Sequence, residues 1–121
     1  MNRLWIFAVA IGFLPTPSAA QIGWGRITKG GPFQEFRDGD WETFRQNVVR
    51  AADAPEGEKP ITWTNAKTGA QGTVSVAKRY DSPKLGACRD VQGQTTARGR
   101  TAPFAITLCR QPGATWQISA E

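Results

Sequence analysis

Two cysteines place the strongest constraint on the fold of this 121-residue chain. Cys88 and Cys109 are equally distant from the dipeptide Arg98-Gly99, so a hairpin that turns there sets them directly opposite each other on neighbouring strands. Opposed residues of antiparallel strands lie ~4.5–5.5 Å apart at Cα, a distance that a disulfide can span. A metal pair or a catalytic dithiol would need closer spacing or more ligands. The spacing therefore predicts a disulfide-linked hairpin over residues 87–110.

The hydrophobic pattern of the same segment supports this register. One face of the hairpin carries the apolar positions Val91, Phe104, Ile106 and Leu108. The other face carries the two cysteines among mostly polar residues, as a half-buried sheet requires. We therefore expect the disulfide on the more exposed face, away from the helix. Pro103 has no backbone N–H to donate, which predicts a bulge or an unpaired position there.

The core that this chain can build is small. After residue 20 it has five Ile, two Leu, five Val and four Phe, and four Trp supply further apolar area. Two leucines and no methionine are too few for a helical bundle. A domain of this size is marginally buried, and exported domains of this kind commonly add a disulfide.

The pattern predicts one helix followed by strands. Residues 41–52 carry one apolar stripe at helical spacing, interpreted as core packing rather than a ligand site, with Asp40 as the expected cap. Strands are predicted over residues 61–64 and 73–80, where Val74, Val76 and Tyr80 would share a face, then over the hairpin. A type II turn over residues 111–114 leads into a last strand over residues 115–118. The predicted class is α+β, with one N-terminal helix packed on a four- to five-stranded antiparallel meander sheet.

The first 20 residues have the order of a secretory signal peptide. A short positive start precedes an apolar stretch from Leu4 to Leu14, and small residues end the segment at Ala20. These 11 apolar residues are fewer than the ~20 that a membrane-spanning helix needs. We therefore expect export with removal of residues 1–20, and no transmembrane anchor. No cysteine stands at the expected cleavage site, so we expect no lipid attachment there.

The remaining chain divides into an arm and a domain. Residues 21–39 contain five glycines, which predicts a flexible arm from which Trp24, Phe33 and Phe36 can dock. The folded domain is expected over residues 40–121. The exported protein is expected to be a monomer in the periplasm or outside the cell, or associated with the outer membrane.

Charge points to the sheet region as the basic part of the chain. The formal net charge is +5, and residues 67–110 hold eight basic against two acidic residues. Solvated surface charge is one interpretation, and attraction to an anionic envelope component is the other. The candidate basic surface comprises Lys78, Arg79, Lys84, Arg98 and Arg100. Export and the lack of a nucleic-acid-binding motif argue against nucleic acid as a partner.

Catalytic and metal-binding patterns are missing from the sequence. There is no histidine, which removes the usual catalytic base and zinc ligand. The close acid pairs Asp38/Asp40 and Glu56/Glu58 fall beside a cap or in a loop, so they are interpreted as solvated acids. We expect no enzyme, no cofactor and no metal site.

Four sequence elements occur in a characteristic order. They are W-x-N-x-x-T-G-x-x-G-x-V from Trp63, Cys-Arg at residue 88, Cys-Arg at residue 109, and W-x-I from Trp116. Together they resemble the 17 kDa surface antigen family of Gram-negative bacteria. The positions that correspond to the family motifs are Trp63, Asn65, Gly69, Gly72, Cys88, Arg89, Cys109, Arg110 and Trp116.

The resemblance implies an envelope-associated domain with no established chemistry. Gly69 and Gly72 would serve the first hairpin, and Trp63 and Trp116 would pack into the core. The chain lacks the lipobox cysteine and the long glycine-rich segment of many family members. Our first hypothesis is a non-enzymatic envelope domain that binds through its basic sheet region. The alternative is a small periplasmic inhibitor or adaptor that binds one protein partner.

Overall fold

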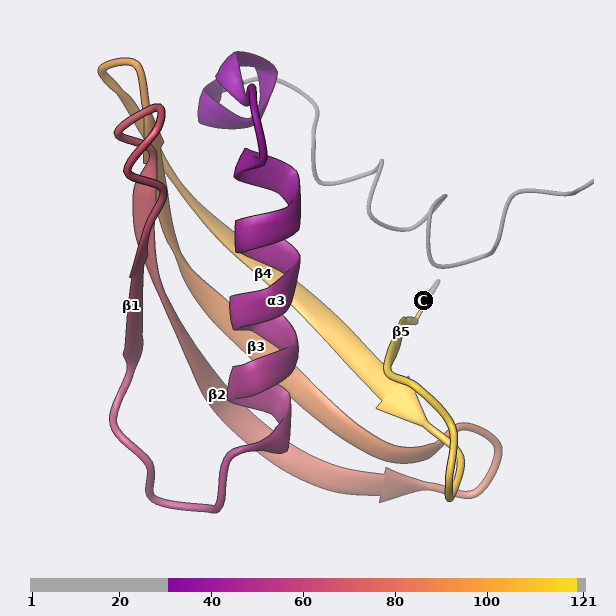
Figure 1. Cartoon of the computed structure of the whole chain (residues 1–121). Helices are drawn as coiled ribbons and strands as arrows, with labels where there is room; N and C mark the ends of the chain where they lie inside the picture. Colours follow the sequence, from indigo (N-terminus) through magenta and orange to yellow (C-terminus); the bar gives the residue numbers. More distant parts are fainter. Residues whose placement is uncertain (1–30, 120–121) are drawn as a thin grey trace, which may run out of the picture.

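The computed structural model describes residues 31–119, in which one α-helix packs against one antiparallel sheet (Figure 1). The elements in chain order are 3-10 helix η1 (Gly31–Glu35), helix α3 (Asp40–Asp53) and strands β1 (Ile61–Thr64), β2 (Gln71–Ser82), β3 (Gly86–Ala97), β4 (Arg100–Arg110) and β5 (Gln117–Ile118). The strand order β1-β2-β3-β4-β5 is that of a meander. The predicted α+β class is therefore confirmed. The expected signal peptide and residues 21–30 of the expected arm lie outside the described residues.

The core lies between α3 and the sheet. On α3, Phe44 and Val48 are fully buried, and they belong to one cluster with Val74, Val91 and Leu108 from the sheet. The apolar stripe of the helix is thus core packing, as expected. Aromatic rings enlarge this small core, since the Phe44 ring contacts those of Phe33, Phe36, Trp41, Trp63 and Phe104.

The segment before the helix is part of this core. Phe33 in η1 is only 6% exposed, and Phe36 packs against the same cluster. Their rings lie 5.2 Å apart in an edge-to-face arrangement. Trp24, the third residue expected to dock, lies outside the described residues.

The predicted register of the β3–β4 hairpin is confirmed. Cys88 pairs with Cys109, and the strands turn at Arg98 and Gly99. Both turn residues have positive φ (49° and 81°), as in a type I′ turn, whose twist matches that of the flanking strands. The cysteines form the predicted disulfide.

The disulfide lies on the sheet face expected for it, the more exposed face away from the helix, but the two cysteines themselves are buried. Cys88 is 0% exposed and Cys109 is 6% exposed. The pair lies in a cross-strand row between Tyr80 of β2 and Gln117 of β5, so a strand flanks it on each side. Alternation along β3 still places Cys88 on the sheet face away from the helix, because its neighbour Arg89 reaches the helix.

The bulge or unpaired position expected at Pro103 is wrong, because the β3–β4 register is continuous through the pair Gln94–Pro103. The Cα atoms of Cys88 and Cys109 are 4.1 Å apart, the spacing of a non-hydrogen-bonded pair. Such pairs alternate along the ladder, so Gln94–Pro103 belongs to the same class. The Pro103 nitrogen therefore points away from β3, where a missing N–H removes no hydrogen bond between β3 and β4.

A bulge occurs instead in β2. Val76 pairs with Val91 and Lys78 pairs with Asp90, which leaves Ala77 without a partner in the register. One extra residue exchanges the two faces of a strand. Tyr80 therefore lies on the face opposite Val76, contrary to the prediction.

The beginning of α3 differs from the prediction as well. Gly39, with φ of 87°, is the N-cap residue, and Asp40 is the first helical residue. The Asp40 side chain is 1% exposed, so its interpretation as a solvated acid is wrong. The turn over residues 111–114 agrees with the type II prediction, because Gly113 has positive φ and the Ala114 N–H donates to the Gln111 carbonyl at 2.9 Å.

Candidate functional site

The sheet has two ends, which we name after their position relative to helix α3. The apical end is defined by the turns at residues 65–70 and 98–99, and the basal end by the segments at residues 83–85 and 111–116. The amino end of α3 contacts the apical end, and its carboxyl end contacts the basal end. The residues that correspond to the family motifs gather at these two ends.

Three arginines from three strands meet at the carboxyl end of α3. We call this group the basal cluster: Arg79 of β2, Arg89 of β3, Arg110 of β4, and Trp116 in the segment before β5. Arg89 is on the helix side of the sheet, and its register neighbour Arg79 reaches the same side because of the bulge at Ala77. Arg110 lies on the helix side as well, because it is two residues after Leu108 on the same strand and side chains alternate between faces.

The arginines cap the helix. The Arg89 Nε donates to the Ala52 carbonyl at 3.3 Å, and an Arg79 Nη donates to the Ala54 carbonyl at 2.8 Å. Another Arg89 nitrogen donates to the Cys88 carbonyl at 2.9 Å. Cations are stabilised at a helix carboxyl terminus by its unpaired carbonyls and by the helix dipole.

Trp116 connects these cations to the last residue of the helix. Its Nε1 donates to Asp53 Oδ1 at 2.8 Å, and the same oxygen lies 3.3 Å from an Arg110 nitrogen. The Arg110 guanidinium carbon is 4.4 Å from the centre of the indole, and that of Arg89 is 5.2 Å away. Both distances are within the range of cation–π attraction.

Positive charge is concentrated in this cluster. Burial, followed by the charges of Arg79 and Arg110, lowers the pKa of Arg89, while Asp81 and Asp53 act in the opposite direction. An arginine nevertheless stays protonated in proteins. The cluster therefore favours the approach of an anion, and guanidinium groups match carboxylate and phosphate geometry.

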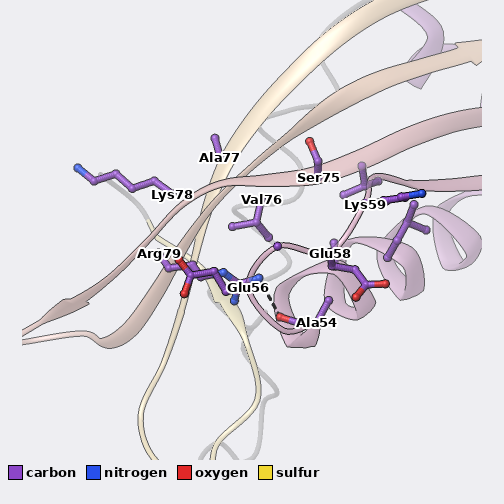
Figure 2. Close-up of a pocket in the computed structure, with 13 residues that line it drawn as sticks. Ala54, Glu56, Glu58, Lys59, Ser75, Val76, Ala77, Lys78 and Arg79 are labelled. Carbon is purple, nitrogen blue, oxygen red and sulfur yellow. Dashed lines mark hydrogen bonds between the residues drawn. The ribbon is translucent and has the colours of Figure 1, made fainter.

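A groove of about 190 Å³ lies beside the cluster, between the loop after α3 and residues 74–79 of β2, and Arg79 is one of its lining residues. Figure 2 shows Arg79 reaching from β2 to the Ala54 carbonyl, whereas Lys78 points away from the groove. The lining mixes acids with bases, since Glu56 and Glu58 accompany Lys59. Among residues 31–119, no group of three potential ligands could hold a metal ion.

The five residues of the candidate basic surface do not form one patch. Lys78, Arg79 and Lys84 lie toward the basal end, whereas Arg98 and Arg100 are at the apical tip of the hairpin. β3 alone spans 12 residues, roughly 36 Å, between these ends. At the tip, Arg98 and Arg100 approach the Glu35 carboxylate at 3.5 and 3.9 Å.

The motif from Trp63 builds the apical end. Gly69 has φ of 85° in the β1–β2 turn, a conformation that favours glycine. A Cβ on Gly72 would lie 2.4 Å from the Gln94 carbonyl oxygen and 2.8 Å from Trp63 Nε1. Gly72 thus allows the Trp63 indole, which is 4% exposed, to lie close over the sheet.

Asn65 connects this turn to the helix. Its Nδ2 donates to Asp40 Oδ1 at 2.6 Å and to the Asp38 carbonyl at 3.0 Å. Thr68 Oγ1 also donates to Asp40 Oδ1, at 2.6 Å. Sequence reasoning missed the roles of Asp40 and Thr68, because no local pattern indicates a contact between residues 28 positions apart.

Trp116→Phe tests the link between the indole and the helix. We expect the free energy of unfolding to fall by about 1 kcal/mol, because the hydrogen bond to Asp53 is lost and the cation–π contacts weaken. Urea unfolding measures this loss. In an Asp53→Ala background the same substitution should cost less, and an equal cost in both backgrounds would contradict the proposed link.

Known proteins with similar sequences identify the family of the chain. The family model of the 17 kDa outer membrane surface antigen matches residues 50–117. The chain belongs to this family. The match begins at Arg50 in α3 and extends to Gln117 in β5, so it includes the whole basal cluster.

Curated relatives give the same family. Two proteins named 17 kDa surface antigen, from Rickettsia bellii and from its strain RML369-C, are each 30% identical over 69 residues. The aligned region is 57% of this chain and 43% of each relative, so the chain spans less than half the length of these relatives. No solved structure matches the chain. Within residues 31–119, no helix is long and apolar enough to cross a membrane.

Proposed function

We propose that this surface antigen-type domain is a non-enzymatic part of the cell envelope, periplasmic or at the cell surface, and that it binds an anionic envelope component. Binding would occur at the basal end, through the basal cluster together with Lys78 and Lys84. The family supports an envelope location, because its model and its curated relatives carry the name surface antigen. The residues that would bind are drawn from β2, β3, β4 and their turns.

The observation that carries this proposal is the meeting of Arg79, Arg89 and Arg110 at one end of the sheet. Burial and the charges of Arg79 and Arg110 lower the pKa of Arg89, and Asp81 and Asp53 raise it. Three guanidinium groups on rigid strands form a preorganised set of donors for phosphate or carboxylate.

The acids support a binding role over a catalytic one. Asp53 accepts from Trp116 and pairs with Arg110, and Asp40 accepts hydrogen bonds at the other end of the helix. These carboxylates are engaged in holding elements together. General acid–base catalysis instead needs a carboxylate within reach of a substrate proton.

Substitution of a basal arginine tests the proposal. We expect Arg79→Gln to weaken binding to soluble dextran sulfate and to isolated envelope membranes about tenfold, because a hydrogen bond to a charged group contributes about 1.5 kcal/mol. Binding should also weaken as salt is raised. The measurement is an affinity titration of the purified, oxidised protein.

Arg98→Gln at the apical tip is the matched control, since it removes the same charge from the same sheet. It should leave both affinities within about twofold, the effect of a distant, screened charge. An equal loss for both variants would contradict a basal site, and binding that ignores salt would contradict an anionic ligand.

A further inference from the structure

The turn between β2 and β3 exposes a leucine at the basal end. Within residues 31–119, the large hydrophobic side chains that are exposed are Tyr80 at 37% and Leu85 at 40%. Leu85 is in the turn, and Tyr80 is two residues from the end of β2. The exposed apolar area thus coincides with the end of the sheet that holds the basal cluster.

Specific contacts hold this turn in place. The Ser82 hydroxyl oxygen accepts from the N–H groups of Lys84 and Leu85 at 3.3 and 3.1 Å. Gln111 Nε2 donates to the Lys84 carbonyl at 2.9 Å, which joins the turn to the segment after β4. A Cβ on Gly86 would lie 2.2 Å from the Arg110 carbonyl oxygen, so the two segments touch closely. Leu85 is therefore exposed by an ordered turn.

Basic residues surround the exposed apolar groups. Lys84 directly precedes Leu85 and is exposed, and Lys78 Nζ lies 5.3 Å from the centre of the Tyr80 ring. Two carboxylates lie near these groups: Asp90 accepts from Tyr80 at 3.4 Å and from Thr107 at 2.8 Å, and the exposed Asp81 directly follows Tyr80 and raises the pKa of Arg89. The arginines of the basal cluster add positive charge on the helix side of the same end.

We infer that the β2–β3 turn docks on an anionic lipid surface. Leu85 enters the boundary between headgroups and acyl chains, Tyr80 lies at headgroup level, and Lys78 and Lys84 contact the phosphates. An apolar side chain framed by cations is the arrangement that binds such interfaces. The inference rests on the proposed function, because it names lipid headgroups as the anion bound at the basal end.

Vesicle cosedimentation tests this inference. The purified, oxidised protein should bind phosphatidylcholine vesicles that contain phosphatidylglycerol and should bind pure phosphatidylcholine weakly. Leu85→Asn should lower the partition coefficient about three- to tenfold, as expected for withdrawing a half-exposed leucine from the interface. Lys84→Gln should lower it about fivefold, the usual effect of one basic residue near an anionic membrane.

Lys67→Gln is the matched control, because Lys67 is also an exposed turn lysine but belongs to the apical end. It should bind vesicles like the unmodified protein. Dextran sulfate separates lipid from soluble polyanion: Leu85→Asn should retain its affinity for dextran sulfate, while Lys84→Gln should lose part of it. Thermal unfolding checks that each variant is folded.

The two proposals fail in different ways. Vesicle binding that is unchanged in Leu85→Asn, or that does not need phosphatidylglycerol, overturns docking by the turn. If Arg79→Gln still weakens dextran sulfate binding in that case, the proposed anion-binding function stands. If the unmodified protein binds neither vesicles nor dextran sulfate, both proposals are overturned.

Discussion

Asp40→Ala is expected to lower the free energy of unfolding by about 3 to 5 kcal/mol, because three hydrogen bonds to a charged group are lost, and this is a large part of the stability of a small domain. The carboxylate is 1% exposed and accepts from the Arg37 N–H at 2.8 Å, in addition to its bonds from Asn65 and Thr68. Removing it leaves these donors without their acceptor in a site with little access to water, which is more costly than the mean worth of a hydrogen bond.

Urea unfolding of the variant measures this effect, with Glu42→Ala as the control. Glu42 is in the same first helical turn, but it is exposed, and its carboxylate accepts from the side chains of Arg45 and Gln46 on the helix surface. Its loss should cost less than about 1 kcal/mol. If Asp40→Ala costs no more than Glu42→Ala, the buried carboxylate does not connect α3 to the β1–β2 turn in the way described.

A double substitution locates the effect in the β1–β2 turn. Thr68→Val removes one donor to Asp40 while keeping the shape of the side chain. The loss for Asp40→Ala with Thr68→Val should be smaller than the sum of the two separate losses, because both remove one interaction. Additive losses would contradict a shared network.

Loss of the disulfide is the second large expected effect. Cys88→Ala combined with Cys109→Ala should lower the free energy of unfolding by about 3 kcal/mol, because the unfolded chain regains the entropy that the crosslink removes. The linked residues are 21 positions apart. Both side chains are buried, so the loss of sulfur packing adds to this cost.

Urea unfolding should give both the double variant and the reduced protein midpoints well below that of the oxidised protein, with the double variant the lower of the two because it also loses sulfur packing. The reduced protein keeps the thiols in place, so a difference between these two measures packing alone. Equal midpoints for the oxidised and reduced forms would contradict a stabilising role of the crosslink.

The hairpin shows what local pattern can predict. Two cysteines at equal distance from Arg98-Gly99 and one apolar face in the same segment specify a single register. The pattern is sufficient because side chains alternate with period two, so a slip by one residue would place the apolar set in solvent. Helix α3 was predictable because its apolar residues recur at helical spacing, which is also a local periodic pattern.

The bulge at Ala77 was not predictable from the same kind of pattern. Residues 73–80 alternate well enough to place Val76 and Tyr80 on one face. Pairing with β3 decides otherwise, because the register on the two sides of Ala77 differs by one residue. This shift brings Arg79 to the helix side and Tyr80 to the other side, so both the basal cluster and the proposed contact of Tyr80 with lipid depend on it.

The candidate site was predictable only as separate residues. The Cys-Arg dipeptides and Trp116 are visible as motifs, but their meeting with Asp53 joins residues 63 positions apart. In the same way, the five candidate basic residues were predicted to form one surface but lie at opposite ends of the sheet. The number of charged residues in a pair of strands does not predict whether they form one surface patch, because the two ends of a long strand are far apart.

By itself, the sequence determined the α+β class, the hairpin register, the disulfide and the family, because each depends on local periodicity or on a short motif. Only the tertiary structure decided the burial of Asp40 and of the disulfide, the position of Tyr80 and the gathering of three arginines at the end of α3. Burial and charge clustering depend on which elements pack together, and that packing joins residues whose separation in the chain carries no local signal.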